Sequence, residues 1–442
     1  MSGAPDRLIL FTRFPLPGSA KTRLIPVLGP EGAAAFQRRL SEHAVQAADA
    51  ARAQRGISLE IRHADGTTAQ MQQWLGSAFS YRPQGAGDLG GRMEACLRAA
   101  FEEGAPRAVL IGADIPALTS AILAQAFEAL TRHDLVLGPA EDGGYYLIGA
   151  TAEAFGRSCA CLGPGIAWGS TDVLARTMAR AREAGLTFAL LATLADVDGP
   201  GDLPAALQAL CRGKTGPALS VVLPALNEAG ELAQTLAALA PNRGIEVIVV
   251  DGGSTDATLA IARKAGVRTL AARPPRSVQM NAGAAAAGGA TLLFLHADTR
   301  LPKGFEEQVQ RALARPAAAA GAFRLRIDGA GRGLRLVEGA ANWRARLLQM
   351  PYGDQALFVK RDVFWEAGAF LPLPIMEDFE FVRRLKTRGR IILAPGSALT
   401  SARRWRRIGL LKTWLVNQRV IAGYCLGCAP ERLAAWYRPK KP

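Results

Sequence analysis

The fold of the second half of this 442-residue chain is decided by the stretch Val247-Ile248-Val249-Val250-Asp251-Gly252-Gly253-Ser254-Thr255-Asp256. Its four leading apolar residues form a continuous run, as in a parallel strand buried on both faces. The glycines that follow allow backbone N–H groups to approach a ligand, and Ser254 or Thr255 can cap the helix after them. The stretch lacks the glycine order of a dinucleotide-binding turn and the Gly-Lys-Ser/Thr of a P-loop. We interpret it as a strand whose carboxyl end binds a base or a ribose.

Similar strands are predicted on both sides of this stretch. They are Leu8–Phe11, Val109–Ile111, Leu219–Pro224 and Leu292–Leu295. Such runs alternate with Ala-rich helical stretches over the whole chain, which is the βαβ pattern of parallel sheets covered by helices. A short segment rich in Gly, Pro and charge interrupts the pattern near residue 213. We therefore predict an α/β protein with a domain at 1–212, a linker at 213–218 and a domain at 219–442.

The composition restricts the classes of protein that the chain can form. Hydrophobic residues make up 49% and charged residues 21%, a mixture typical of globular domains and not of disorder. Four histidines exclude a His-rich metal cluster, and six cysteines are too few for a disulfide scaffold. The N-terminus lacks the apolar core of a secretory signal, and no apolar stretch approaches the roughly 20 residues of a membrane span. We therefore expect a cytoplasmic protein.

The net charge of +15 is distributed unevenly between the two halves. Residues 1–212 hold 19 Lys and Arg against 21 Asp and Glu, whereas the remainder holds 34 against 17. The basicity of the second half favours anionic sugar donors first, a membrane surface second and nucleic acid a distant third. Because neither an aromatic platform for single strands nor a reading helix is found, no nucleic acid is expected as a partner.

Cationic and metal-binding residues follow the central stretch. Arg273 and Arg276 precede a helix of small residues, where their guanidinium groups suit a diphosphate; a solvated basic loop is the alternative. The strand Leu292–Leu295 leads to His296 and Asp298. One carboxylate together with substrate phosphates is a common way to hold Mg²⁺ or Mn²⁺. We expect Asp298 to be the metal ligand, with His296 either assisting it or packing beside it.

Two further acidic motifs lie nearer the C-terminus. They are Gly353-Asp354-Gln355 and the adjacent pair Glu377-Asp378, which opens an amphipathic helix. Carboxylates also stabilise a helix N-terminus through the macrodipole, so the pair has a purely structural alternative. We favour a functional role, since a carboxylate beside an acceptor hydroxyl can act as a general base.

Together these motifs make the second half resemble the family 2 inverting glycosyltransferases, which have the GT-A fold. The resemblance includes Val221–Glu228 and is greatest to bacterial enzymes of arsenosugar biosynthesis, through Arg276-x-x-Gln279-Met280-Asn281 and Leu295–Thr299. It implies that Asp251 binds the nucleobase or ribose, that Asp298 ligates the metal and that Asp378 is the catalytic base. The donor-binding residues expected in this half are Pro224, Asn227, Glu228, Asp251, Gly253, Asp256, Arg273, Arg276, Gln279, Asn281, Asp354, Glu377, Arg404 and Trp405.

The sequence departs from the family pattern at two places. The usual metal motif is Asp-x-Asp, and here His296 replaces its first member. Processive members carry Gln-x-x-Arg-Trp, whereas Ser401-Ala402-Arg403-Arg404-Trp405 lacks the Gln. We therefore expect transfer of a single sugar from a nucleoside-diphosphate sugar, specifically a UDP-sugar, to a small or lipid-like acceptor.

The first half resembles nucleotidyltransferase-like GT-A proteins related to 2-phospho-lactate guanylyltransferase and molybdenum-cofactor guanylyltransferase. The matching stretches are Lys21–Leu24, Gly112–Pro116, Asp142–Tyr145 and Asp196–Asp198. The resemblance implies a nucleotide and metal site formed by Gly18, Lys21, Arg23, Asp114, Asp142, Gly143, Gly144 and Asp198. Two alternatives are a half that makes the activated donor for the other half and a half that binds a nucleotide without catalysis.

The C-terminal segment is basic and partly apolar. From Arg403 onward it holds ten Lys and Arg and one acid, Glu431, with an apolar region at Ile408–Cys428. We favour a helix that packs on the domain. The alternative is a peripheral contact with anionic lipid on the inner face of the plasma membrane.

Overall fold

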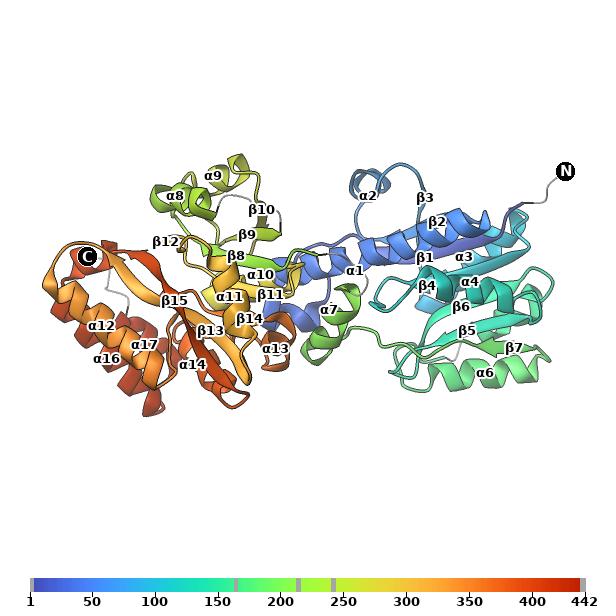
Figure 1. Cartoon of the computed structure of the whole chain (residues 1–442). Helices are drawn as coiled ribbons and strands as arrows, with labels where there is room; N and C mark the ends of the chain where they lie inside the picture. Colours follow the sequence, from blue (N-terminus) through green and yellow to red (C-terminus); the bar gives the residue numbers. More distant parts are fainter. Residues whose placement is uncertain (1–3, 163–165, 212–215, 240–243, 438–442) are drawn as a thin grey trace. The chain divides into compact units, whose positions relative to one another are not determined.

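The computed structural model describes residues 4–162, 166–211, 216–239 and 244–437 (Figure 1). The chain divides into two compact units, the first formed by Met1–Lys21 and Ala34–Arg212 and the second by Thr22–Ala33 and Gly213–Pro442. Most of the predicted linker at 213–218 lies outside the described residues. Among the described helices, none combines the length and the apolar character that a membrane crossing requires.

The first unit is built on a seven-stranded sheet with the order β3-β2-β1-β4-β6-β5-β7. Its strands are β1 (Arg7–Arg13), β2 (Ser58–Ala64), β3 (Ser80–Pro83), β4 (Arg107–Gly112), β5 (Leu135–Pro139), β6 (Tyr145–Thr151) and β7 (Phe188–Leu190). Its main helices are the part of α1 (Ile25–Arg55) from Ala34 onward, α2 (Thr68–Leu75), α3 (Leu89–Glu102), α4 (Ser120–Ala129), α6 (Val173–Glu183) and α7 (Leu203–Cys211), with a short α5 (Phe155–Ser158).

Both faces of this sheet are buried. Leu8 and Leu10 of β1 lie in one apolar cluster, and Ile9 and Phe11 lie in another. Because successive side chains of a strand point to opposite faces, the continuous apolar run of β1 serves two cores at once.

The second unit is built on an eight-stranded sheet with the order β10-β9-β8-β11-β14-β13-β15-β12. Its strands are β8 (Leu219–Ala225), β9 (Ile245–Asp251), β10 (Arg268–Ala271), β11 (Thr291–Phe294), β12 (Thr299–Arg300), β13 (Ala318–Asp328), β14 (Phe358–Lys360) and β15 (Arg390–Ser401). Its helices are α8 (Ala229–Leu239), α9 (Thr258–Lys264), α10 (Arg276–Ala286), α11 (Phe305–Leu313), α12 (Arg332–Leu347), α13 (Arg361–Glu366), α14 (Glu377–Lys386), α15 (Arg403–Ile408), α16 (Leu410–Cys425) and α17 (Pro430–Tyr437).

Helices cover both faces of this second sheet as well. On one face, Val221 and Leu223 of β8 lie in a core shared with α8, α9 and α11. On the other face, α10 approaches β8 so closely that a Cβ on Gly283 would lie 2.4 Å from Val222 Cγ1. The glycine thus allows the helix to lie directly on the sheet.

The predicted pair of α/β domains is confirmed, but the sheets are mixed and not purely parallel. In the first unit, β6 runs antiparallel to β4 and β5. The connection from β5 to β6 has only five residues, 140–144, and a parallel pair needs a crossover of a dozen or more. In the second unit, β14 runs antiparallel to β11 and β13, and β12 runs antiparallel to β15.

One segment of the predicted first domain groups with the second unit. Thr22–Ala33 packs on α10, where Asn281 Nδ2 donates to the Val27 carbonyl oxygen at 3.0 Å. Gly29 interrupts α1 with a φ of 71°, and a Cβ there would lie 2.7 Å from Val278 Cγ1. The positive φ and the close approach explain why glycine occupies this position.

Candidate active site in the second unit

A cavity of about 480 Å³ opens at the carboxyl ends of β8 and β11. The N-terminal ends of α10 and α14 border it, and α16 and α17 contribute to its wall. The predicted site residues that the structure places in this wall are Pro224, Glu228, Arg276, Gln279, His296, Asp298, Asp354, Glu377 and Asp378. Residues that are far apart in the sequence therefore meet at the edge where open α/β sheets bind their ligands.

Asp378 is held in place by backbone amides. Its Oδ2 accepts a hydrogen bond from the Gly353 N–H at 2.6 Å, and its Oδ1 accepts one from the Phe379 N–H at 2.7 Å. A Cβ on Gly353 would lie 3.0 Å from Asp378 Oδ2, so glycine permits this close approach. An ionised carboxylate offers about four lone-pair positions, which leaves room for a substrate hydroxyl.

Arg276 links three parts of the cavity wall. Its Nε donates to Glu377 Oε1 at 2.7 Å, and Glu377 is only 2% exposed. This carboxylate raises the pKa of Arg276. Arg276 Nη1 lies 3.2 Å from His296 Nε2. Because a guanidinium group only donates, His296 Nε2 must be the acceptor.

In this geometry Nε2 of His296 is engaged by Arg276, and the expectation that His296 assists a metal stays a prediction. The lone pair of Nε2 that a metal would need already faces Arg276. Burial, and then the charge of Arg276, lower the pKa of His296 to about 3, so the ring is neutral at physiological pH. His296 acts here as a packing and hydrogen-bonding partner of Arg276.

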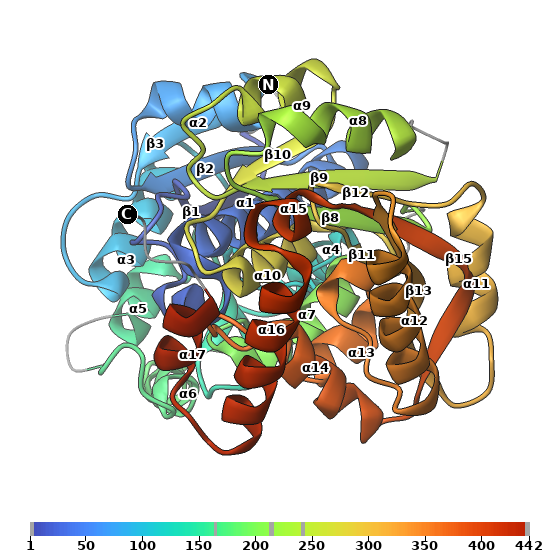
Figure 2. The ribbon, with the colours of Figure 1, turned by 90° about the vertical axis from the view of Figure 1, so that its left-hand side faces the viewer.

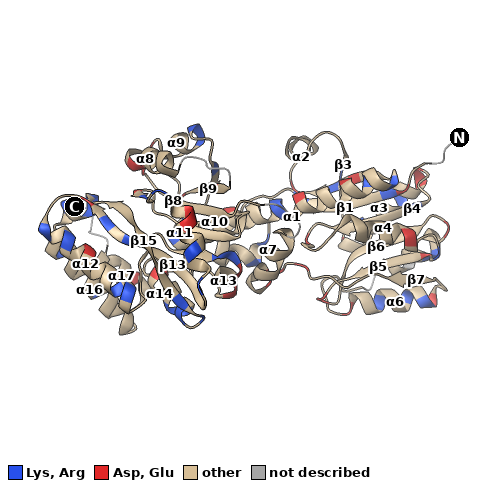
Figure 3. Cartoon of the chain, in the orientation of Figure 1, with Lys and Arg blue, Asp and Glu red and all other residues tan. Residues whose placement is uncertain are grey.

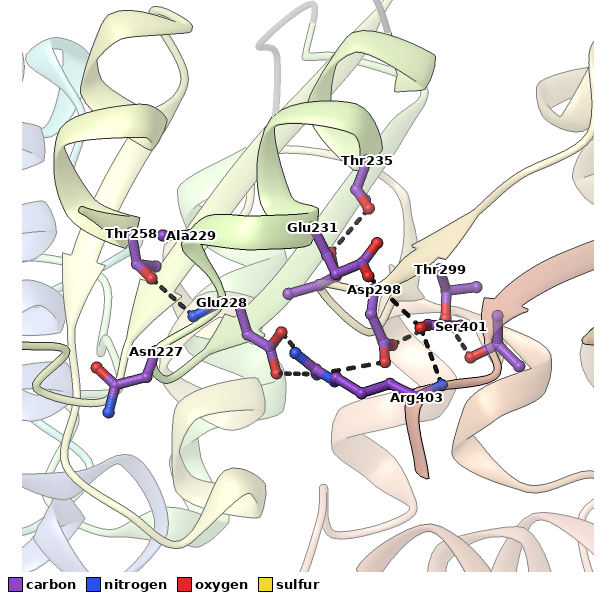
Figure 4. Close-up of polar contacts among 12 residues, drawn as sticks. Asn227, Glu228, Ala229, Glu231, Thr235, Thr258, Asp298, Thr299, Ser401 and Arg403 are labelled. Atoms are coloured by element: carbon purple, nitrogen blue, oxygen red, sulfur yellow. Dashed lines mark hydrogen bonds and ion pairs between the residues drawn. The ribbon is translucent and has the colours of Figure 1, made fainter. Parts of the chain in front are cut away.

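Asp298 belongs to an acidic cluster that surrounds Arg403 (Figure 4). Arg403 Nη2 donates to both carboxylate oxygens of Glu228, at 2.9 and 2.8 Å, and lies 3.6 Å from Asp298 Oδ2. Burial raises the pKa of Glu228 and of Asp298, while Arg403 opposes this shift. The positive charge of Arg403 thus offsets the negative charges of Glu228 and Asp298. Arg403 is not among the site residues predicted from the sequence.

A divalent cation fits this region only with help from a substrate. Among the described residues, no group of three or more His, Cys, Asp or Glu side chains is arranged to hold one. Asp298 offers a single half-buried carboxylate, with Arg403 beside it. A cation at Asp298 would take its remaining ligands from phosphate oxygens and water.

Asp354 carries a buried oxygen that lacks a partner. Its Oδ1 has no hydrogen-bond partner among the described residues, although it is shielded from solvent. Burial raises the pKa of this carboxyl to about 6. The unsatisfied acceptor belongs to a residue of the cavity wall, so a ligand hydroxyl or a water can complete it.

Asp354→Asn is expected to stabilise the protein above pH 6. A folded-state pKa of about 6 exceeds the unfolded value near 3.9, so the ionised carboxylate destabilises the fold once the pH rises through both values. Chemical unfolding of Asp354→Asn at pH 8 should give a free energy of unfolding roughly 1–3 kcal/mol above that of the wild type, and this difference should vanish near pH 4.

Asp256→Asn is the control for that prediction, and it should lower the free energy of unfolding at pH 8 where Asp354→Asn raises it. Hydrogen bonds from Thr258 lower the pKa of Asp256, so its ionised form stabilises the fold above pH 4. A loss of stability at pH 8 in Asp354→Asn would contradict the assignment of Asp354 as an unfavourably buried carboxylate.

Several predicted donor-binding residues lie outside the cavity wall and hold the neighbouring turn. Asp251 Oδ2 accepts hydrogen bonds from the backbone of Gly253 and Ser254, at 3.0 and 3.1 Å. Asp256 accepts from the Thr258 N–H, and Asn227 Oδ1 accepts from the Thr255 N–H. The predicted capping of α9 by Ser254 or Thr255 is wrong, because the helix begins only at Thr258 and Ala257 occupies the cap position.

Other predicted residues have structural contacts or lie in solvent. Asn281 is fully buried; its Nδ2 donates to the carbonyl oxygens of Val27 and Phe370, and its Oδ1 accepts from the Phe370 N–H, so both of its N–H groups are used within the protein. Trp405 packs in an apolar cluster with α12 and β13. Arg273 is 85% exposed and lies 3.7 Å from Glu31.

The sequence missed much of the cavity wall that comes from the C-terminal helices. These additional lining residues include Asn417, Val420 and Ile421 of α16 and Tyr437 of α17, and Tyr352, which precedes Gly353, is a further lining residue that was not predicted. Arg404, a predicted donor-binding residue, instead stacks on Tyr437, with its Cζ 3.5 Å from the ring centroid. Aromatic residues interleaved with arginines in the basic segment were the available signal for such contacts.

The first unit has a cavity of its own, of about 380 Å³. It lies at the carboxyl ends of β1 and β4 and is lined by Arg13, Gln84, Arg92 and, of the predicted residues, by Asp114. Lys21 Nζ lies 3.0 Å from Asp114 Oδ2 and donates to the Val197 carbonyl oxygen. These contacts bring the predicted Lys21 and Asp114 together.

The other predicted residues of the first half are placed differently. Asp142 Oδ1 accepts from the Gly144 N–H at 2.9 Å, and Gly143 has a φ of 89° that brings it against Thr171. Burial, followed by the charges of Asp142 and Asp198, raises the pKa of Asp196 to about 6. Gly18 lies in an exposed turn, and Arg23 belongs to the segment Thr22–Ala33 that groups with the second unit.

Known protein families match one stretch in each of the two units. Residues 46–170 match the family described as "Uncharacterized protein conserved in bacteria (DUF2064)", and residues 220–370 match "Glycosyl transferase family 2". The second unit thus contains a glycosyl transferase family 2 domain, and the first contains a DUF2064 domain. A comparison with curated proteins gives no match.

Three solved structures illustrate the similarity. A Desulfovibrio desulfuricans G20 protein, provisionally described as a nucleotide-diphospho-sugar transferase, is 33% identical over 48% of this chain and 90% of its own, with a TM-score of 0.43. S. aureus TarS 1-349 in complex with UDP-GlcNAc is 18% identical over 41% of this chain and 58% of its own, with a TM-score of 0.34. The mannosyltransferase PcManGT from Pyrobaculum calidifontis, in complex with GDP-Man and Mn²⁺, is 18% identical over 54% and 80%, with a TM-score of 0.35.

Proposed function

We propose that the second unit transfers a single sugar from a nucleoside-diphosphate sugar, specifically a UDP-sugar, to a small or lipid-like acceptor with inversion. The observation that carries this proposal is the cavity that collects Arg276, Asp298 and Asp378 at the strand ends of a family 2 domain. The motifs shared with arsenosugar-biosynthesis enzymes support a small acceptor. The apolar wall at Val420 and Ile421 supports a lipid-like one.

The diphosphate of the donor is expected to lie between Arg276 and Asp298. Arg276 has five N–H donors and uses its Nε on Glu377 and Nη1 toward His296, which leaves donors for phosphate oxygens. Mg²⁺ or Mn²⁺ bound by Asp298 and the diphosphate would supply charge neutralisation of the leaving group. Gln279, which packs against Gly252, is expected beside the ribose.

Asp378 is the proposed general base. Its carboxylate takes the proton of the acceptor hydroxyl while that oxygen attacks the anomeric carbon. The bond from this carbon to the diphosphate oxygen breaks, and the nucleoside diphosphate leaves with the electron pair. One displacement inverts the configuration at the carbon, and Arg276 stabilises the departing charge.

The experiment that tests this proposal is a measurement of nucleoside diphosphate release by the full chain with Mn²⁺ and a panel of UDP- and GDP-sugars. We expect release from at least one UDP-sugar. A thermal-shift screen with the same compounds and with oligonucleotides should show stabilisation by that sugar. If the chain released no nucleotide and were stabilised only by oligonucleotides, a nucleic-acid-binding function would replace the proposed one.

For the first unit we propose a nucleotide-binding function, supported by the position of Arg13, Arg92 and Asp114 around a cavity at the strand ends. The unit either forms the activated donor, with release of pyrophosphate, or binds a nucleotide without catalysis. Formation of the activated donor would be supported if the chain released pyrophosphate from a nucleoside triphosphate and a sugar phosphate, and if Asp114→Asn abolished this release. Nucleotide binding without pyrophosphate would support the second role, and the absence of both would overturn the proposal.

A further inference from the structure

Exposed apolar side chains concentrate at one end of the second unit. Of the fourteen large hydrophobic residues that are exposed in the described part of the chain, nine lie between 336 and 348 or between 410 and 426. They are Leu336, Trp343, Leu347, Leu348, Leu410, Leu411, Trp414, Leu415 and Leu426. A soluble surface rarely gathers so many, so this concentration indicates an interaction site.

The helix α12 has an apolar stripe on its outer side. Leu336, Trp343 and Leu347 are spaced by seven and four residues, so they share one face of the helix, and they are 75%, 60% and 58% exposed. The opposite face is buried through Leu334 and Ala341 in an apolar cluster. The inner face alone therefore accounts for the packing of α12, and the outer stripe has no partner among the described residues.

The helix α16 has the same construction. Leu411, Trp414 and Leu415 share its outer face, at spacings of three and four residues. Val420, on the opposite side of the helix from Leu411, and Ile421, seven residues after Trp414, line the candidate active site. Trp414 therefore lies where the outer stripe meets the side that faces the cavity. The two helices meet at their N-terminal ends, where Leu410 packs over Gly333, and both lie at the same end of the second unit (Figures 1 and 2).

Exposed basic residues lie on or beside both helices (Figure 3). Arg332 and Arg346 of α12, Arg407 at the end of α15 and Lys412 of α16 are all exposed. The single acid of α12, Glu338, is buried and paired with Arg335. An apolar face with tryptophans and neighbouring cations is typical of a helix that lies in the interface of an anionic bilayer.

We propose that the outer faces of α12 and α16, defined by Leu336, Trp343, Leu347, Leu411, Trp414 and Leu415, dock on an anionic lipid membrane. Charge complementarity selects this occupant. A second copy of the chain on a two-fold axis would bring the arginines of both copies together, whereas anionic headgroups neutralise them. This inference stands independently of the proposed sugar transfer, although docking would place the wall formed by α16 beside the bilayer.

The test is flotation of the full chain with vesicles of phosphatidylcholine alone or of phosphatidylcholine with phosphatidylglycerol. We expect binding only to the anionic vesicles, weakened by added salt. The double variant Trp343→Gln/Trp414→Gln should lower the partition coefficient at least about tenfold, and Lys412→Gln should lower it roughly fivefold. Because these side chains are exposed, the unfolding temperature should stay within a few degrees.

Leu190→Gln is the matched control, since Leu190 is exposed to a similar extent but belongs to the first unit. Its vesicle binding should equal that of the wild type. The proposal is overturned if the wild type binds neither vesicle, or if the double tryptophan variant binds as the wild type does. A dimer in solution that dissociates in the double variant, without vesicle binding, would identify a second copy as the occupant and would equally overturn it.

Discussion

Asp378→Asn should reduce the turnover number by about 10²–10⁴-fold, which is the usual contribution of a positioned general base. The carboxylate opens α14 inside the cavity, and backbone amides of Gly353 and Phe379 fix its orientation. Asparagine keeps the shape but cannot accept the acceptor's proton. Steady-state release of nucleoside diphosphate in the presence of an acceptor would measure the loss, and the donor KM should change by only a few-fold.

The neighbouring carboxylate provides the control. Asp354 has a pKa raised to about 6 by burial and lines the same cavity, so its chemistry alone would also suit a base. If Asp354→Asn abolished turnover while Asp378→Asn retained it within several-fold, the base would be Asp354. Near-ultraviolet circular dichroism of both variants excludes misfolding as the cause of a loss.

Arg276→Met should lower the free energy of unfolding by about 2–3 kcal/mol, because it leaves the buried Glu377 carboxylate without its partner. Removing one partner of a fully buried ion pair costs about 3–5 kcal/mol of stability. Because Arg276 is itself 43% exposed, the expected loss lies at or below the lower end of that range. Urea unfolding at pH 7 measures it. Turnover should fall as well, since the cation beside the diphosphate is lost.

The double variant Arg276→Met/Glu377→Gln separates these two effects. Removing both charges should recover most of the stability while leaving turnover low. Additive losses of stability in the double variant would show that the two residues act independently, and would contradict the role of Glu377 as the anchor of Arg276.

The sequence predicted local elements well where a continuous apolar run marks a buried strand. The predicted strand Leu219–Pro224 is one residue shorter than β8, and the predicted Leu292–Leu295 is shifted by one residue from β11. The direction of β14 could not be predicted in this way, because its pairing with β11 joins residues more than 60 positions apart. The short turn between β5 and β6 did contain a hairpin signal, because its glycines lie between two apolar runs.

The candidate site was predictable as a set of residue types but not as a set of contacts. Arg276 and Glu377 were each singled out, yet their ion pair spans 101 positions. Asn281 lies within a matching motif, but its amide bonds to the backbone of the segment near Val27, which no local pattern indicates. Arg403 was passed over in favour of Arg404, although Arg403 is the one that reaches Glu228.

The most direct test of the account is the binding of a UDP-sugar to the full chain, measured by titration calorimetry with Mn²⁺. Asp298→Asn in the second unit and Asp114→Asn in the first are matched substitutions of carboxylates that line the two cavities. Asp298→Asn should weaken binding at least about tenfold, because a charge-assisted contact is lost, and Asp114→Asn should leave binding unchanged. Unchanged binding in Asp298→Asn, or a loss confined to Asp114→Asn, would contradict the assignment of the donor site to the second unit.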